Sequence, residues 1–235
     1  MSQLSSQTAA VLRQNLTNLL AKREAAASES GRDASDIQLL AVSKKQPASA
    51  IREVYDAGLP AFGENYVQEA LDKQEELKDL AIDWHFIGPI QSNKTRDIAN
   101  GFSWVHSVDR PKVAQRLSAQ RESHLPALNV CVQVNLSGEA SKSGVALNEV
   151  EALCQLVSTL PSLRLRGLMA IPEALESYEA QRACFAPLRG EFERLQNQFP
   201  SLDTLSIGMS GDFEAAIAEG STLVRIGTAL FGQRR

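Results

Sequence analysis

Short apolar segments alternate with amphipathic or charged segments along almost the entire chain, and this alternation restricts the possible folds more than any other feature. Each apolar segment is short and bounded by polar or turn residues, which is typical of buried strands in a parallel sheet. The predicted strands span residues 37–44, 61–64, 82–87, 102–106, 128–134, 163–170, 202–207 and 223–226. The helices predicted after them span residues 47–57, 67–80, 92–99, 111–120, 147–160, 174–198 and 213–218, and residues 228–231 close the chain.

Eight strand–helix units in 235 residues match the size of a closed (β/α)8 barrel, or TIM barrel. An open doubly wound α/β sheet is the alternative, but no G-x-G-x-x-G pattern follows the first strand. An amphipathic helix over residues 4–27 precedes that strand. No shift in composition suggests a linker, so we predict one domain over residues 1–235, in which residues 1–35 are the N-terminal helix and its connector.

The composition excludes several classes of protein. Twenty-four basic and 28 acidic residues give a net charge of −4 without a basic block, so a nucleic-acid partner is not expected. No apolar run reaches the ~20 residues of a membrane span, and the N-terminus lacks the apolar core of a signal peptide. The cysteines and histidines show no metal or redox spacing. We therefore predict a reduced, cytoplasmic protein without a metal, and an acidic barrel without an outer hydrophobic stripe predicts a monomer.

The first strand ends on a lysine at the position where α/β proteins place their chemistry. Lys44 follows an apolar run, and Pro47 suits the first turn of the next helix. A lysine in a barrel mouth forms a Schiff base with an aldehyde when it is buried or lies beside another cation such as Lys45. Taken alone, the stretch fits two solvated lysines in a loop better, because lysine is usually exposed.

The segments after the seventh and eighth strands contain residue types that bind phosphate. Residues 206–212 combine two serines and two glycines with a following helix, whose N-terminus favours an anion. Residues 225–228 offer an arginine, a glycine and a threonine. Each segment alone reads as an ordinary tight turn, but barrels often bind phosphate at these two loops. Together with Lys44 they describe a barrel that holds an aldehyde and a phosphate, and pyridoxal 5′-phosphate (PLP) carries both groups.

Six segments that follow one another along the chain resemble the pyridoxal phosphate homeostasis protein family. They are residues 41–44 (AVSK), 62–69 (FGENYVQE), 85–94 (HFIGPIQSNK), 166–172 (RGLMAIP), 205–210 (LSIGMS) and 224–229 (VRIGTA). The resemblance covers nearly the whole chain and implies a fold like the N-terminal barrel of alanine racemase. It also implies that the first-strand lysine, here Lys44, carries PLP as an aldimine. Lys45 should not, since consecutive strand residues point to opposite sides.

The same resemblance assigns roles to further positions. The positions that anchor the phosphate are matched by Ser210, Gly227 and Thr228, with Gly208 in the same turn as Ser210. The positions expected to line the cofactor ring are Asn65, His85, Met169 and Ser206. For His85, a satisfied histidine at a strand end is an equally good interpretation.

Arg225 matches the arginine of the eighth strand, which in related racemases faces the pyridine nitrogen of the cofactor. Arginine donates hydrogen bonds and accepts none, so an arginine there leaves this nitrogen unprotonated and makes the ring a weaker electron sink. A contact between Arg225 and the phosphate is the alternative.

The resemblance implies a non-catalytic protein that carries PLP and takes part in intracellular PLP (vitamin B6) homeostasis, with PLP-dependent apo-enzymes as candidate partners. A PLP-dependent amino-acid racemase is the alternative, and an aldolase that uses Lys44 on a sugar phosphate is a weaker one. Racemases of this kind use a second domain to supply a tyrosine acid/base, and we do not expect that domain here. Of the three tyrosines, only Tyr66 is expected near the barrel mouth.

Two charged segments have a solvated surface as their simplest interpretation. The polar loop over residues 138–144 fails the P-loop pattern, because Ser141 rather than glycine precedes Lys142. The alternative for Lys142 is a secondary PLP acceptor on a loop at the barrel mouth. The charged helix over residues 68–80, which includes Lys73, is expected to be a solvated face with local ion pairs.

Overall fold

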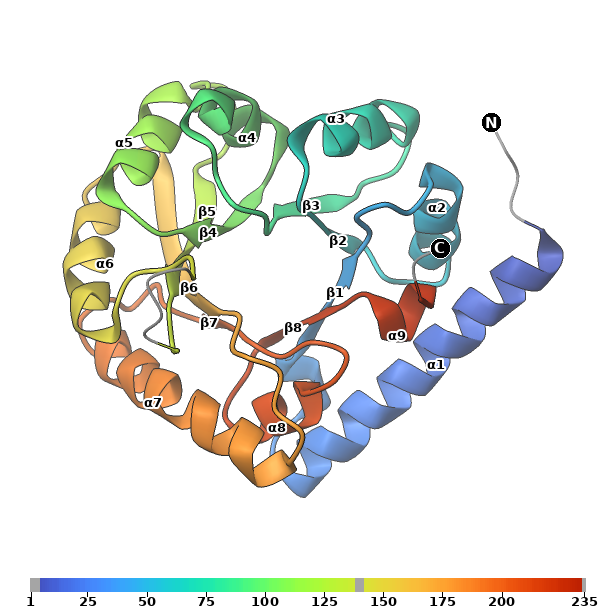
Figure 1. Cartoon of the computed structure of the whole chain (residues 1–235). Coiled ribbons are helices and arrows are strands. Elements are labelled where there is room, and N and C mark those ends of the chain that lie inside the picture. The colour runs from blue at the N-terminus through green and yellow to red at the C-terminus, as the bar shows by residue number, and fades with distance from the viewer. Residues whose placement is uncertain (1–4, 138–141, 234–235) are drawn as a thin grey trace.

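The computed structural model describes residues 5–137 and 142–233, and within them the fold is a closed barrel of eight parallel strands (Figure 1). The strands follow the chain order around the barrel, and the last pairs with the first. They are β1 (Gln38–Val42), β2 (Ala61–Glu64), β3 (Asp83–Phe86), β4 (Trp104–Val108), β5 (Leu128–Val134), β6 (Leu163–Ala170), β7 (Thr204–Ser206) and β8 (Leu223–Ile226). The predicted TIM barrel is confirmed.

Helices follow the strands and surround the barrel. They are α2 (Ala48–Asp56), α3 (Val67–Glu76), α4 (Thr95–Gly101), α5 (Pro111–Gln120), α6 (Val150–Ser158), α7 (Tyr178–Gln196), α8 (Phe213–Ala218) and α9 (Thr228–Phe231). Short 3-10 turns also occur in the described residues, namely η1 (Ala34–Asp36), η2 (Ser92–Lys94) and η3 (Leu147–Glu149). None of the described helices combines the length and the apolar character that crossing a membrane would require.

The N-terminal helix α1 (Ser6–Glu29) lies along the outside of the barrel, beside α2, α8 and α9 (Figure 1). Leu12, Leu16 and Leu19 are buried because their spacing of three and four residues places them on one helix face. The Asn15 side-chain amide donates a hydrogen bond to the Leu230 carbonyl at 2.9 Å and so connects α1 to α9. The predicted N-terminal helix is therefore present, with residue 4 outside the described residues.

Several helix ends differ from the prediction for local reasons. Helix α7 begins at Tyr178 instead of residue 174, because the Ser177 hydroxyl caps it by accepting a hydrogen bond from the Ala180 N–H at 3.2 Å. The helix predicted over residues 67–80 ends at Glu76. Pro47 is the cap before α2 and not its first residue.

The apolar core lies mainly between the strands and the helices, and the barrel interior is more polar. Strand residues point alternately outward and inward, so the outward residues pack under the helices. Inside the barrel, Trp104, Cys131 and Met169 form a small buried cluster. The fully buried His85 stacks on Trp104 with ring centroids 5.2 Å apart, and His106 is also fully buried.

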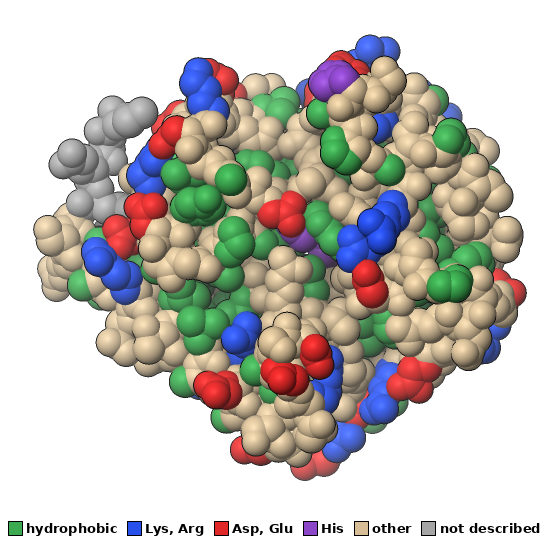
Figure 2. All heavy atoms as spheres, turned by 180° about the vertical axis from the view of Figure 1, so that it is seen from behind, with side chains coloured by type: hydrophobic (Ala, Val, Ile, Leu, Met, Phe, Trp, Pro, Cys, Tyr) green, Lys and Arg blue, Asp and Glu red, His purple; other side chains and the backbone are tan. Residues whose placement is uncertain are grey.

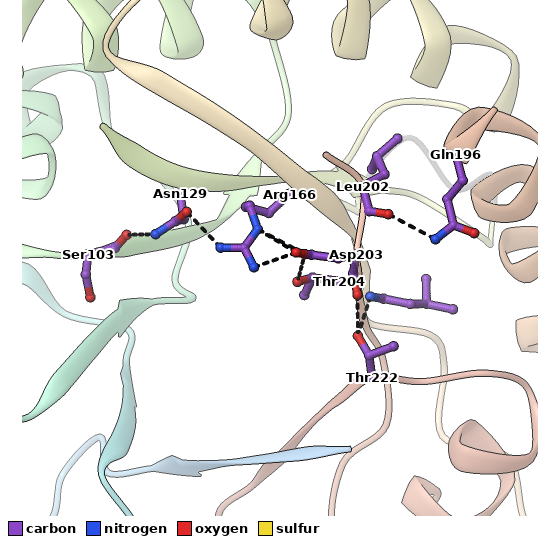
Figure 3. A network of polar contacts seen from close by, with 9 residues as sticks. Ser103, Asn129, Arg166, Gln196, Leu202, Asp203, Thr204 and Thr222 are labelled. Atoms are coloured by element: carbon purple, nitrogen blue, oxygen red, sulfur yellow. Dashed lines mark hydrogen bonds and ion pairs between the residues drawn. The ribbon is translucent and has the colours of Figure 1, made fainter. Parts of the chain in front are cut away.

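The N-terminal ends of the strands are here called the floor, and a polar network lies there between β5, β6 and β7 (Figure 3). Arg166 forms a two-point ion pair with the Asp203 carboxylate and donates to the Asn129 side-chain oxygen at 3.0 Å. The face shown in Figure 2 carries side chains of both charges mixed with apolar ones, without a large block of one sign. The C-terminal ends of the strands are here called the mouth.

Candidate functional site

A cavity of about 280 Å³ opens at the mouth of the barrel, at the end where TIM barrels place their active sites. Its lining comes from the ends of the strands and the loops after them: Val42, Lys44, Asn65, Ile87, Ile171, Met209, Ser210, Gly211, Arg225, Gly227 and Thr228. A larger hollow of about 440 Å³ lies outside the barrel, where Arg194 already pairs with Glu151 and with Glu191. The mouth cavity is therefore the better candidate for a binding site.

The turn after β1 separates the two consecutive lysines. Lys44 lines the cavity, whereas Lys45 is exposed and does not. Both residues follow the strand, so strand alternation is not the cause of their divergence. The cause is the backbone of Lys45, whose φ of +63° lies in the left-handed region that few residues other than glycine adopt. The Lys45 N–H donates a hydrogen bond of 2.5 Å to the Glu69 carboxylate, which holds this conformation.

A buried ion cluster lies under this turn and corrects the predicted solvated position of Lys73, whereas Asp72, Glu75, Glu76 and Lys78 are exposed as predicted. Lys73 is only 6% exposed, and its ammonium donates to the carboxylates of Glu64 at 2.8 Å and Glu69 at 2.6 Å. It also donates to the Ser43 carbonyl at 2.8 Å, while the Ser43 hydroxyl donates to Glu64 at 2.6 Å. The cluster thus contacts both neighbours of Lys44 in the chain and fixes the turn that presents it.

Glu64 is the most enclosed member of this cluster. Its side chain is fully buried at the end of β2, and one carboxylate oxygen, Oε2, has no hydrogen-bond partner in the described residues. Burial raises the pKa of Glu64, and the charge and hydrogen bond of Lys73 oppose that rise. Lys73 is therefore the group that keeps this carboxylate compatible with the interior.

Arg225 extends from β8 into the barrel beneath the cavity. Its guanidinium donates to the carbonyl and the hydroxyl of Ser206, at 2.5 and 2.8 Å, and to the Ala170 carbonyl at 2.8 Å. Burial lowers the pKa of Arg225 to about 10, so the side chain stays a cation at neutral pH. The cavity therefore has a fixed positive charge at its base.

Residues with hydroxyl groups and glycines, from the loops after β7 and β8, form one edge of the cavity. The Ser210 hydroxyl accepts a hydrogen bond from the Ala229 N–H at 3.2 Å, which joins the loop after β7 to the start of α9. Within the loop after β7, the Asp212 carboxylate at the cap of α8 accepts a hydrogen bond from the Met209 N–H at 2.6 Å. Thr228 is exposed at this edge, so its hydroxyl is accessible to a ligand.

Asn65 contributes the remaining polar group, and a glycine explains its placement. A Cβ atom on Gly88 would lie 2.2 Å from the Asn65 carbonyl oxygen, so only glycine allows the two loops to approach this closely. The side-chain oxygen of Asn65 is buried and has no hydrogen-bond partner in the part of the chain that the structure describes. A buried acceptor without a partner at a cavity wall is suited to a ligand that donates a hydrogen bond.

Comparisons with known proteins agree with this geometry. The family model of the alanine racemase N-terminal domain matches residues 16–235. The pyridoxal phosphate homeostasis protein of Pseudomonas aeruginosa is 62% identical over 221 residues, which cover 94% of this chain and 95% of that protein. The Escherichia coli protein of the same name is 52% identical over 223 residues, which cover 94% and 95%. The chain belongs to the pyridoxal phosphate homeostasis protein family.

A solved structure of a relative supports the same assignment. PipY of Synechococcus elongatus, in a structure with PLP bound, is 40% identical and superposes with a TM-score of 0.81. The alignment covers 94% of this chain and all of PipY. Family membership and barrel architecture are thus established together.

Four positions that the family resemblance assigns to the cofactor do not line the cavity. His85, Met169 and Ser206 are fully buried in the barrel interior, and His85 is bonded to His106 and Asp83 as a satisfied histidine. Gly208 is also buried; its φ is +93°, and a Cβ there would lie 2.6 Å from the Ala216 methyl. These four residues lie beneath and beside the cavity and do not form its surface.

Three charged residues beneath the site received no functional role from the sequence. Glu64 and Glu69 lie within the family segment FGENYVQE without an assigned role, and Lys73 was interpreted as a surface charge. One sequence signal points to part of this cluster: Glu69 and Lys73 are four residues apart, which places them on the same helix face as an ion pair. Lys142 is exposed, and part of the loop that carries it, residues 138–141, lies outside the described residues.

Proposed function

We propose that this chain binds PLP in the mouth cavity as an aldimine with Lys44, and holds it for PLP homeostasis without robust catalysis. One observation carries the proposal: a single small cavity collects a lysine from the turn after β1, an arginine from β8 and a hydroxyl-rich edge from the loops after β7 and β8. PLP needs an amine for its aldehyde and several donors for its phosphate. The PLP-bound structure of PipY, a relative 40% identical, supports this choice of ligand.

The depth at which the polar residues lie in the cavity supports one orientation for bound PLP. Arg225 is fixed at the buried base of the cavity, whereas Ser210 and Thr228 lie at its edge. We therefore assign the ring nitrogen to Arg225 and the phosphate to Ser210, Gly227 and Thr228. Asn65 supplies the acceptor for a ring substituent that donates a hydrogen bond. When bound, PLP would supply an electrophilic carbon and an electron-withdrawing ring.

The residues that line the cavity support the proposal that the protein lacks robust catalysis. Lys44 and Arg225 are the only titratable side chains among the described lining residues, and Arg225 stays charged. Proton transfer at both faces of an amino-acid α-carbon requires a second acid/base group, worth roughly 10²–10⁴-fold in rate. The curated relatives carry the name of homeostasis proteins. PLP-dependent apo-enzymes remain candidate partners, and a monomeric cytoplasmic state remains a prediction.

A spectroscopic titration combined with a turnover assay tests the proposal. We expect the purified protein to become yellow with one equivalent of PLP, and to show no robust racemisation, decarboxylation or transamination of a panel of L- and D-amino acids. An authentic alanine racemase under the same conditions is the positive control. Absence of a PLP complex would reject the proposal as a whole. Turnover that is lost in Lys44→Ala would instead reassign the protein as a PLP enzyme.

Removing the hydroxyls at the cavity edge is expected to weaken PLP binding without changing the fold. Ser210→Ala and Thr228→Ala each delete a donor to an anion, and such a hydrogen bond contributes about 1.5–3 kcal/mol. Dissociation constants from absorbance titration measure the loss, and thermal melting checks the fold. Ser158→Ala is the matched control, because the Ser158 hydroxyl bonds only locally, to the Gln155 carbonyl on α6. Wild-type affinity in both edge variants would contradict the phosphate assignment.

A further inference from the structure

A chain of hydrogen bonds crosses the barrel interior from the base of the cavity to the floor. Arg225 bonds the Ser206 hydroxyl at 2.8 Å, which lies 2.9 Å from His106 Nδ1. His106 Nε2 lies 2.8 Å from His85 Nδ1, and His85 Nε2 lies 3.2 Å from the Asp83 carboxylate. The four strands β3, β4, β7 and β8 each contribute inward-pointing members.

The two ends of this chain determine the direction of every bond in it. Arginine can only donate, so the Ser206 oxygen accepts from Arg225 and its own hydrogen is available to His106 Nδ1. A neutral His106 that accepts at Nδ1 carries its hydrogen on Nε2 and donates to His85 Nδ1. His85 in turn donates from Nε2 to Asp83, which as a carboxylate can only accept. The reverse direction would place an unprotonated His85 nitrogen against the carboxylate.

The surroundings favour neutral rings and a fixed geometry. Burial lowers the pKa of His85. Burial, with the neighbouring His85 ring and the charge of Arg225, lowers the pKa of His106 well below its usual value. The His85 ring is parallel to Trp104 within 3°, and the Arg166 guanidinium lies 4.5 Å from the Trp104 ring on the floor. The Ser103 hydroxyl, which lies near the network of Figure 3, donates to the second oxygen of Asp83.

We propose that His85 and His106 are positioning residues for Arg225: as neutral Nε2–H tautomers they form a one-way hydrogen-bond chain that holds the Ser206 hydroxyl, and through it the guanidinium, toward the cavity. Ser206 alone could rotate its hydroxyl, and the buried acceptor at His106 Nδ1 prevents this. The guanidinium is then oriented before a ligand arrives, which lowers the ordering cost of binding. The effect on PLP affinity rests on the function proposed above, but the chain of hydrogen bonds exists in the ligand-free protein.

Nitrogen NMR of the ligand-free protein tests the direction of the chain. The sequence contains three histidines, and exposed His124 supplies a reference signal in the same spectrum. Long-range ¹H–¹⁵N correlation at pH 7 should show His85 and His106 as neutral Nε2–H tautomers. The Nη1–H hydrogens of Arg225, which bond the carbonyl and the hydroxyl of Ser206, should be protected from exchange, and Ser206→Ala should weaken that protection and shift the His106 Nδ1 signal. An Nδ1–H tautomer or an imidazolium at either position would overturn the proposal.

PLP binding supplies the second readout. His106→Leu removes both bonds of His106 and leaves the Ser206 side chain free to turn away from Arg225. Loss of the Ser206–Arg225 hydrogen bond, which involves a charged group, should lower PLP affinity about tenfold. His106→Gln keeps an acceptor and a donor and should recover most of that loss, with a visible absorption maximum like that of the wild type. Equal affinities and spectra in both variants would reject the positioning role. If His106→Leu does not fold, Ser206→Ala decides, and failure of the wild type to bind PLP would count only against the proposed function.

Discussion

Lys44→Ala should abolish covalent retention of PLP, whereas Lys45→Gln should leave it unchanged. Lys44 lines the cavity, and the left-handed backbone of Lys45 directs that side chain to solvent. The variant without Lys44 loses the amine to which we assign the bond with the aldehyde, but it keeps the arginine and the hydroxyl edge. PLP should therefore still bind weakly and be removed by dialysis, while the wild type retains it.

Borohydride reduction followed by peptide mass spectrometry measures this difference directly. In the wild type the label should be on the peptide that contains Lys44, and in Lys45→Gln the yield should equal that of the wild type. The adjacent lysine is a stringent control because it carries the same charge and lies in the same turn. A stable label on Lys45, or a visible aldimine band that survives Lys44→Ala, would show that the wrong lysine has been assigned.

Lys73→Met should destabilise the fold far more than the loss of a surface lysine. It leaves the fully buried Glu64 carboxylate without its cation, and breaking a buried ion pair in this way typically costs ~3–5 kcal/mol of unfolding free energy. It also removes the hydrogen bond to the Ser43 carbonyl, so the turn that presents Lys44 loses a support. Urea denaturation monitored by circular dichroism measures the stability, and a PLP titration measures the effect on the turn.

Two further variants separate charge burial from the simple loss of a lysine. Lys78→Met removes an exposed ion pair with Glu75 and should leave the stability close to that of the wild type. The double variant Glu64→Gln with Lys73→Met has no unpaired buried charge at Glu64, and it should recover a large part of the loss. A single Lys73→Met variant as stable as Lys78→Met would contradict the buried-cluster interpretation.

The strands were largely predictable from the sequence because a buried parallel strand has a local signature. The segments 61–64, 128–134, 163–170 and 223–226 are short and rich in apolar residues, with polar or turn residues around them, and the structure places β2, β5, β6 and β8 at these residues. Helix ends were less predictable, since a cap such as Ser177 acts through one side chain. The order of strands around a closed barrel follows once eight units are recognised.

Long-range partners explain what the sequence did not reveal about the site. Lys73 looks like a surface lysine on α3, and only its contacts with β2 and the β1 turn show that it is buried. The same holds for His106, whose partners Ser206 and His85 come from β7 and β3. Local pattern identifies which residues could carry chemistry, whereas burial of a charge depends on neighbours far away in the chain.

Closure of the barrel has a kinetic consequence for the site. The lysine turn follows β1 and the arginine lies on β8, and these strands are joined by the pairing with the greatest sequence separation in the barrel. Such contacts carry the largest cost in loop-closure entropy, which favours their formation after the local contacts. While the β1–β8 seam is open the cavity lacks one side, so a ligand cannot assist folding before the seam closes. It can act only on the finished barrel, by mass action and by slowing the opening of the β1–β8 seam.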